Sequence, residues 1–222
     1  MKTQRTKPEL DVKTELYSLL LLAGGKSSRM GRDKAELLLD GKSFMECLVD
    51  KAQKLGIREK YLSGHSWEGE GIHIIPDRYS GRGPLGGMHA CFLAMDTPYA
   101  LVLPVDVPQI PMNVLETLLT AHGRLLSGDG KRKEEKTDRK SLRPLLLSHG
   151  RRIEPIIGIY PTALGKRIGE LIEEKSAPVF RLLEETGYEI CRVPVQEWEM
   201  GNINTPEDYK SLLERQKRGI EK

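Results

Sequence analysis

Apolar residues along the chain gather in short continuous runs that alternate with stretches of helical spacing. Residues 16–23 form a nearly continuous apolar run that ends at two glycines, which is typical of a strand buried on both faces of a parallel sheet. Residues 43–55 then place apolar side chains three and four positions apart, with Ser43 in position to cap a helix and Gly56 in position to end it. The pattern therefore predicts a buried strand followed by an amphipathic helix.

The same alternation continues toward the C-terminus. Pro111 stands where proline is favoured, at the start of a helix. Strands that alternate with helices predict an open, three-layer α/β sheet that is mostly parallel. The further elements expected are strands at 61–62, 72–75, 99–103, 145–147, 155–160 and 190–195, and helices at 85–95, 111–122, 162–173, 179–185 and 206–216.

Composition limits the class of protein. Hydrophobic residues make up 38% and charged residues 30% of the 222 positions, which predicts a soluble globular protein with a sizeable core. The net charge is +3, from 35 basic and 32 acidic residues, so we expect no binding to nucleic acid or to membranes. Residues 1–14 are polar, and the longest apolar run is far too short to span a bilayer. We therefore expect a cytoplasmic protein.

The hydrophobic pattern also predicts the domain organisation. Residues 1–14 are expected to form a mobile N-terminal tail, and residues 15–222 a single domain. Residues 127–141 contain no apolar residue, so they cannot bury enough surface to offset the entropy of ordering. We expect a disordered insertion there, with a basic contact surface for a partner as the alternative.

The strongest chemical signal lies at residues 22–34 (LAGGKSSRMGRDK), directly after the first predicted strand. Gly24 and Gly25 allow the backbone to turn sharply and to bring its N–H groups close to a ligand. Clustered cations beside backbone amides suit a polyphosphate, whereas the alternative is a solvated basic turn. The cations of this segment are Lys26, Arg29, Arg32 and Lys34.

Two other phosphate-binding motifs fit less well. A P-loop requires G-x-x-x-x-G-K-[ST], but Glu36 stands where the first glycine belongs, five residues before Gly41. Residues 81–86 (GRGPLG) satisfy G-x-G-x-x-G, but the preceding strand is expected to end at Ile75, and this fingerprint should turn directly off its strand. A dinucleotide-binding oxidoreductase is therefore a distant alternative.

Asp106 follows the predicted strand at 99–103, at the edge where open α/β sheets bind their ligands. A carboxylate that faces a triphosphate is a natural Mg²⁺ ligand, because magnesium uses one or two carboxylates together with phosphate oxygens. The alternative is a helix cap ahead of Pro111. Elsewhere the five histidines show no metal-binding spacing, Ser27 and Ser28 lack a G-x-S-x-G elbow, and the three cysteines form no C-x-x-C pair.

Together these blocks resemble the molybdenum cofactor guanylyltransferases, which are MobA-like nucleotidyltransferases with a Rossmann-like fold of the GT-A type. Residues 22–34 resemble the signature L-A-G-G-x-S-x-R-M-G-x-D-K, and weaker blocks follow in family order at 83–87, 106–108, 154–155 and 202–208. The chain departs from the family at Val105, where cysteine or alanine is common. The insertion at 127–141 is also unusual in a compact member.

The resemblance implies a role for each matching residue. Arg29, Lys34 and Asp106 would be catalytic, with Asp106 as the Mg²⁺ ligand and the two cations on the phosphates. The region around Ser63 and His65 would contact the base. On the pterin side the matching residues are Asn202 and Asn204. The nucleotide would be bound by Leu22, Ala23, Gly24, Gly25, Lys34, Asp77 and Asp106.

The implied reaction joins GTP to molybdenum-bound molybdopterin and releases pyrophosphate. The terminal phosphate of the pterin would attack the α-phosphorus of GTP in line, with no dedicated general base. Molybdenum-insertion proteins and apo-molybdoenzymes are implied as partners. The alternatives are a related transferase that uses CTP or a sugar or alditol phosphate, and a non-catalytic nucleotide-binding regulator of molybdenum metabolism.

Overall fold

The computed structural model describes residues 12–24, 37–68, 70–79, 81–128, 143–174 and 178–220. Three sequence predictions fall largely on other residues. Most of the predicted N-terminal tail, most of the cationic loop and all but the first two residues of the predicted insertion lie outside the described part of the chain. Thr14 and Ser127, at the edges of the tail and the insertion, belong to helical segments.

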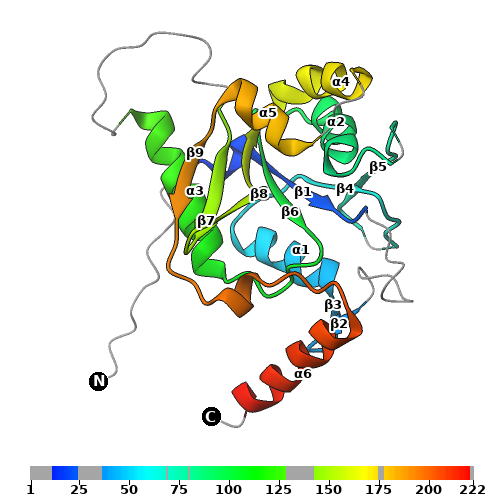
Figure 1. Ribbon diagram of the computed structural model, residues 1–222, viewed down its shortest axis with the longest axis vertical. Helices are drawn as coiled ribbons and strands as arrows, with labels where there is room; N and C mark the ends of the chain where they lie inside the picture. Colours follow the sequence, from blue (N-terminus) through cyan, green and yellow to red (C-terminus); the bar gives the residue numbers. More distant parts are fainter. Residues whose placement is uncertain are drawn as a thin grey trace.

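A seven-stranded sheet forms the centre of the protein (Figure 1). β8 runs antiparallel to both of its neighbours, whereas the other four neighbouring pairs are parallel. This confirms the predicted three-layer, mostly parallel α/β sheet. The strands in spatial order are β5 (His73–Ile75), β4 (Lys60–Ser63), β1 (Tyr17–Leu22), β6 (Tyr99–Pro104), β8 (Arg152–Pro161), β7 (Leu145–His149) and β9 (Glu189–Arg192).

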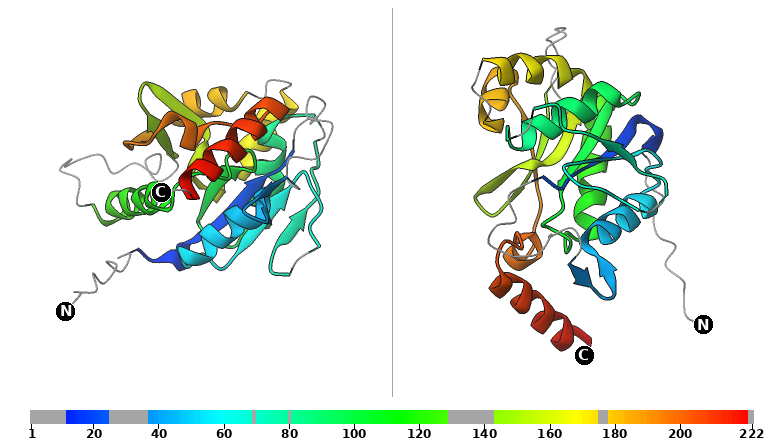
Figure 2. Two further views of the ribbon diagram at one scale, coloured as in Figure 1. Left: turned by 90° about the horizontal axis from the view of Figure 1, so that it is seen from below. Right: turned by 90° about the vertical axis from the view of Figure 1, so that its right-hand side faces the viewer.

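Helices cover both faces of this sheet (Figure 2). α1 (Phe44–Lys54) and α3 (Met112–Ser127) pack on the face that receives Leu19 and Leu21. The opposite face receives Leu20 and Leu22, and α2 (Pro84–Ala94), α4 (Gly165–Glu173) and α5 (Val179–Thr186) pack on it. Since β1 is buried on both faces, its apolar run is continuous rather than alternating. No helix among the described residues is long and apolar enough to cross a membrane.

Several element boundaries differ from the sequence prediction. α3 continues past residue 122 to Ser127 and ends at Gly128, whose left-handed backbone (φ 74°) terminates the helix. Pro111 is the N-cap of α3 rather than its first residue. β9 ends at Arg192 rather than at residue 195. Arg192 pairs with Ser148, and β7 itself ends at the next residue, His149, so later residues of β9 have no strand to pair with there. The prediction also missed a small hairpin of β2 (Leu38–Leu39) and β3 (Lys42–Ser43).

The C-terminal part adds a short 3-10 helix, η6 (Glu197–Met200), and a long helix, α6 (Pro206–Ile220). α6 lies beside the β2–β3 hairpin and points away from the main sheet (Figure 1). Other short 3-10 segments are η1 (Thr14–Leu16) and η5 (Thr162–Leu164). All three cysteines are free thiols; Cys91 and Cys191 are buried, and Cys47 is half-buried.

A buried histidine makes the stability of this fold depend on pH. The Tyr17 hydroxyl forms a hydrogen bond of 2.8 Å with Nδ1 of His122, and both side chains are buried. Burial lowers the pKa of His122 from 6.5 to about 4, so the unfolded chain takes up a proton at this site before the folded protein does. Stability contributed by the neutral ring is therefore fully present above pH 6.5 and is lost as the pH falls toward 4.

We expect this effect to lower the free energy of unfolding by roughly 3 kcal/mol across that pH range. Urea unfolding at a series of pH values measures it. His122→Gln should flatten the dependence, because glutamine does not titrate. Parallel curves for wild type and His122→Gln would contradict the prediction.

Candidate active site

The strand order places a crevice beyond the carboxyl ends of β1 and β6. From β1 the chain passes through α1 to β4 and β5 on one side, and then returns through α2 to β6 on the other side of β1. Such a reversal of direction opens the ligand crevice of an open α/β sheet. Leu22 and Pro104 are register partners there, and the Val105 N–H donates to the Leu22 carbonyl at 3.1 Å. The ends of the two strands are thus held together.

A cleft with a volume of about 110 Å³ occupies this crevice. Its walls come from the ends of β1, β4 and β6, the segment after β5, the start of α2 and Ile156 of β8. The polar side chains in its lining are those of Ser63, Asp77 and Asp106. The cleft brings together five predicted site residues, which are Leu22, Ala23, Gly24, Asp77 and Asp106. The other loop residues, Gly25, Arg29 and Lys34, lie outside the described part of the chain.

Asp106 is half-buried in the turn that follows β6. Its carbonyl accepts a hydrogen bond from the Ile203 N–H at 2.8 Å. Two residues later, the Pro108 carbonyl accepts from Nζ of Lys51 on α1, also at 2.8 Å. Burial lowers the pKa of the Lys51 ammonium, but this hydrogen bond gives it a partner. The turn that carries the Asp106 carboxylate is therefore fixed from two sides.

Asp77 follows β5 and lies against the first turn of α2. A Cβ added to Gly86 would be 2.7 Å from Oδ1 of Asp77, so only glycine allows this approach. Burial raises the pKa of the Asp77 carboxyl, and a hydrogen bond from the Tyr79 backbone opposes the shift. The N-cap of α2 is Gly83, which provides no side-chain cap, and Pro84 at the first helical position has no backbone N–H.

Gly64 brings the end of β4 into contact with the start of the glycine-rich loop. Its backbone is left-handed (φ +87°), and an added Cβ would lie 2.4 Å from the Gly24 nitrogen. The Ala23 N–H also donates to the Ser63 carbonyl at 2.9 Å. Sequence reasoning missed the role of Gly64, although a glycine directly after a predicted strand was a usable signal. Ile156 was also missed, because nothing in its neighbourhood marks it as a cleft residue.

The residues predicted for the pterin side lie next to Asp106 in the fold. Asn202 and Asn204 are half-buried and flank Ile203, whose N–H contacts the Asp106 carbonyl. Neither asparagine belongs to the described lining of the cleft. The structure thus places them in the segment that contacts the Asp106 turn.

No group of three or more histidine, cysteine or acidic side chains among the described residues is arranged to hold a metal ion. A protein cage of the kind that binds zinc or calcium is therefore not present in that part of the chain. The cleft instead offers the Asp106 carboxylate, with room beside it for a ligand. This arrangement suits a cation that is also held by phosphate oxygens.

Comparisons with known proteins agree with this architecture. Residues 19–188 match the family described as "MobA-like NTP transferase domain". The molybdenum cofactor guanylyltransferase of Pseudomonas aeruginosa is 29% identical over 195 residues, which cover 86% of this chain and 91% of that protein. A probable molybdenum cofactor guanylyltransferase of Flavobacterium johnsoniae is 26% identical over 200 residues, which cover 89% of this chain and 97% of that protein.

Solved structures show the same fold. The molybdopterin-guanine dinucleotide biosynthesis protein A of Archaeoglobus fulgidus superposes with a TM-score of 0.65 at 21% identity, covering 90% of this chain and 99% of that one. A nucleotidyl transferase of Methanothermobacter thermautotroptrophicus gives a TM-score of 0.69 at 18% identity, covering 91% and 98%. At these identities the likeness concerns the fold alone.

Proposed function

Because the chain belongs to the MobA-like NTP transferase family, we propose that it transfers GMP from GTP to the terminal phosphate of molybdenum-bound molybdopterin, releasing pyrophosphate. The observation that carries the proposal is the cleft, which joins Leu22–Gly24, Asp77 and Asp106 at the switch point of the sheet. The guanylyltransferase names of relatives that align over most of this chain support GTP as the donor.

The reaction needs positioning and charge stabilisation more than acid–base chemistry. The phosphate nucleophile is anionic at neutral pH, so no side chain has to remove a proton from it. The backbone of Leu22–Gly24 and the Asp77 carboxylate would hold the nucleoside at the end of β1. Arg29 and Lys34 would neutralise the charge that develops on the triphosphate as the α–β bond breaks.

Asp106 would hold a divalent cation, for which we propose Mg²⁺. A half-buried carboxylate beside open space fits this hard cation, which takes oxygen ligands and keeps part of its coordination for phosphates. When bound, the ion would offset negative charge on the triphosphate. The backbone bonds to Ile203 and Leu22 would keep the carboxylate turn in place.

Pyrophosphate release with Mg²⁺ and molybdenum cofactor, compared for GTP, CTP, ATP and UTP, tests the function. GTP-selective release with formation of the guanine dinucleotide is the expected result. Release with CTP alone would instead identify the protein as a cytidylyltransferase with the same fold. If folded, nucleotide-binding protein released no pyrophosphate with any nucleotide, the transfer reaction would be excluded and the regulatory alternative favoured.

Because Gly64 contacts Gly24, we expect nucleotide binding to be sensitive to substitution of Gly64. A methyl group at Gly64 would overlap the Gly24 backbone, so Gly64→Ala must displace the start of the loop. We expect the KM for GTP to rise about tenfold, on the order of 1.4 kcal/mol. Gly71→Ala is the matched control, because Gly71 has a similar positive φ (+78°) but no atom within 4 Å of an added Cβ. Equal KM values for both variants would contradict the prediction.

A further inference from the structure

A third hydrophobic cluster joins segments that are far apart in the sequence. It contains Leu37, Leu39, Phe44, Ile203 and Leu212, with Tyr209 packed against it. The first three residues come from the β2–β3 hairpin region and the start of α1, whereas the last three come from the C-terminal segment and α6. Figure 1 shows α6 beside the hairpin, which leads directly into α1.

Two hydrogen bonds extend this cluster to the edges of the active site. The Tyr209 hydroxyl donates to the Leu38 carbonyl at 2.8 Å, and its ring meets Phe44 edge-on at a centroid distance of 6.1 Å. The Ile203 N–H donates to the Asp106 carbonyl at 2.8 Å. The C-terminal segment therefore contacts both the turn that carries Asp106 and the β2–β3 hairpin, which follows the predicted nucleotide loop in the sequence.

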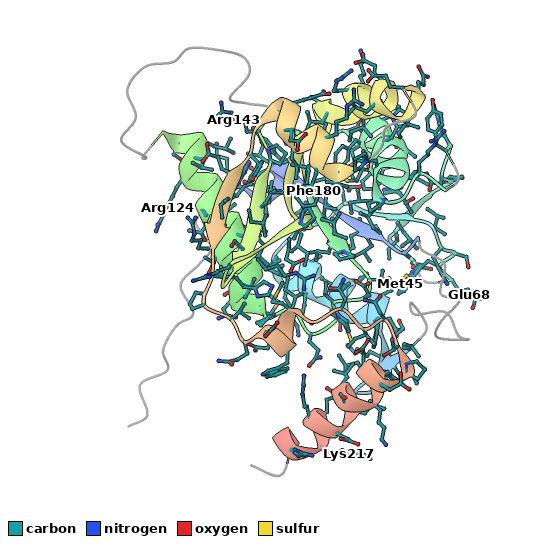
Figure 3. All side chains as sticks on the ribbon, in the orientation of Figure 1. Met45, Glu68, Arg124, Arg143, Phe180 and Lys217 are labelled. Carbon is teal, nitrogen blue, oxygen red and sulfur yellow. The ribbon has the colours of Figure 1, made fainter. Side chains whose placement is uncertain are left out.

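The N-terminal half of α6 is well anchored. The N–H groups of Asn204 and Thr205 both donate to Oδ2 of Asp208 at 2.9 Å, and the Asp208 N–H donates to the Thr205 hydroxyl at 3.1 Å. Leu212, one turn further, is 1% exposed. The outer half of the helix extends away from the sheet, as Lys217 shows in Figure 3. Contact with the site thus depends on residues up to Leu212.

We propose that α6 positions the nucleotide site, with Leu212 and Tyr209 as positioning residues that act through the third hydrophobic cluster. The two points that flank the predicted nucleotide loop in the sequence are Gly24, just after β1, and Leu37, just before β2. Gly64 fixes the first point, and the cluster fixes the second. The match to the family model ends at residue 188 and so does not include α6. The inference rests on the proposed function for the identity of the ligand.

Leu212→Ala in the full chain tests the proposal. It should weaken GTP binding about tenfold in calorimetric titration with Mg²⁺ and without acceptor. It should also speed amide hydrogen exchange at residues 37–39 and 105–107 in the absence of nucleotide. Leu212→Met, which keeps most of the side-chain volume, should restore both properties. Tyr209→Phe, which removes only the hydroxyl, should weaken GTP binding by a smaller factor, about threefold.

Leu118→Ala is the matched control, because Leu118 is a buried leucine of α3 in the main core. It should lower the melting temperature and leave GTP affinity at 20 °C unchanged. If Leu212→Ala behaved like this control, with unchanged affinity and exchange, the proposal would be overturned. If wild-type protein bound no GTP, the proposed function would fail, and the exchange measurements would still decide whether α6 supports the two segments.

Discussion

Replacing Asp106 by asparagine should lower the rate of GMP transfer about 100- to 1,000-fold at a fixed Mg²⁺ concentration, or roughly 3–4 kcal/mol. The amide lacks the negative charge that a hard cation prefers in its ligands. The turn itself should survive, because its bonds to Leu22 and Ile203 involve backbone atoms that Asp106→Asn retains. A Mg²⁺ titration of the initial rate should therefore show a large increase in the concentration needed for half-saturation.

Asp77→Asn provides the comparison within the same cleft. Asp77 lies against α2 on the β5 side, and it matches a family aspartate near the nucleoside rather than the metal ligand. This variant should raise the KM for GTP and leave the midpoint of the Mg²⁺ titration unchanged. A wild-type midpoint in Asp106→Asn, or equal midpoint shifts in both variants, would remove Asp106 from its role as the metal ligand.

Much of the fold could be predicted because its signals are local. The run that forms β1 is apolar at every position, since the sheet covers β1 with helices on both faces. Ser43 was expected to cap α1, and its hydroxyl accepts from the Glu46 N–H at 3.2 Å while Glu46 accepts from the Ser43 N–H at 2.6 Å. Such signals involve residues three or four positions apart, which a single sequence displays directly.

The missed features depend on contacts between distant segments or on very short elements. The β2–β3 hairpin has only two residues in each strand, although its turn at Asp40-Gly41 has the positive φ values (52° and 77°) typical of an Asp-Gly turn. Only the fold shows that Gly64 abuts Gly24. The bond between Tyr209 and Leu38 spans 171 positions, so no sequence window contains both partners.

The residues of the candidate site are also of two kinds: some are marked by local signals, and others depend on contacts between distant segments. A strand-end aspartate at 106 could be predicted from the order of elements, because strands of a parallel sheet end at one edge. Asp77 came from the family resemblance alone. Its position depends on Gly86, which lets α2 approach to a distance that no other residue allows. Gly86 is visible in the sequence, but only the fold shows that the Asp77 carboxylate lies against it.

Lys34→Ala should lower the rate of GMP transfer roughly 30- to 1,000-fold, or about 2–4 kcal/mol. The resemblance to the family signature implies that this ammonium contacts the phosphates, where a positive charge would stabilise the transition state more than the bound substrate. The loss should therefore fall mainly on kcat, measured under saturating GTP and Mg²⁺. Lys26→Ala is the matched control, because it removes the same charge from the same segment without touching a signature position.

The two lysines should also differ in their response to salt. If Lys26 acts only through its long-range field, the modest effect of Lys26→Ala should vanish as ionic strength rises, because screening weakens exposed charges over about 10 Å. A direct contact between Lys34 and the phosphates is screened much less, so the defect of Lys34→Ala should persist at high salt. Equal, salt-sensitive defects in the two variants would show that the segment contributes net charge alone, and Lys34 would lose its assigned role in catalysis.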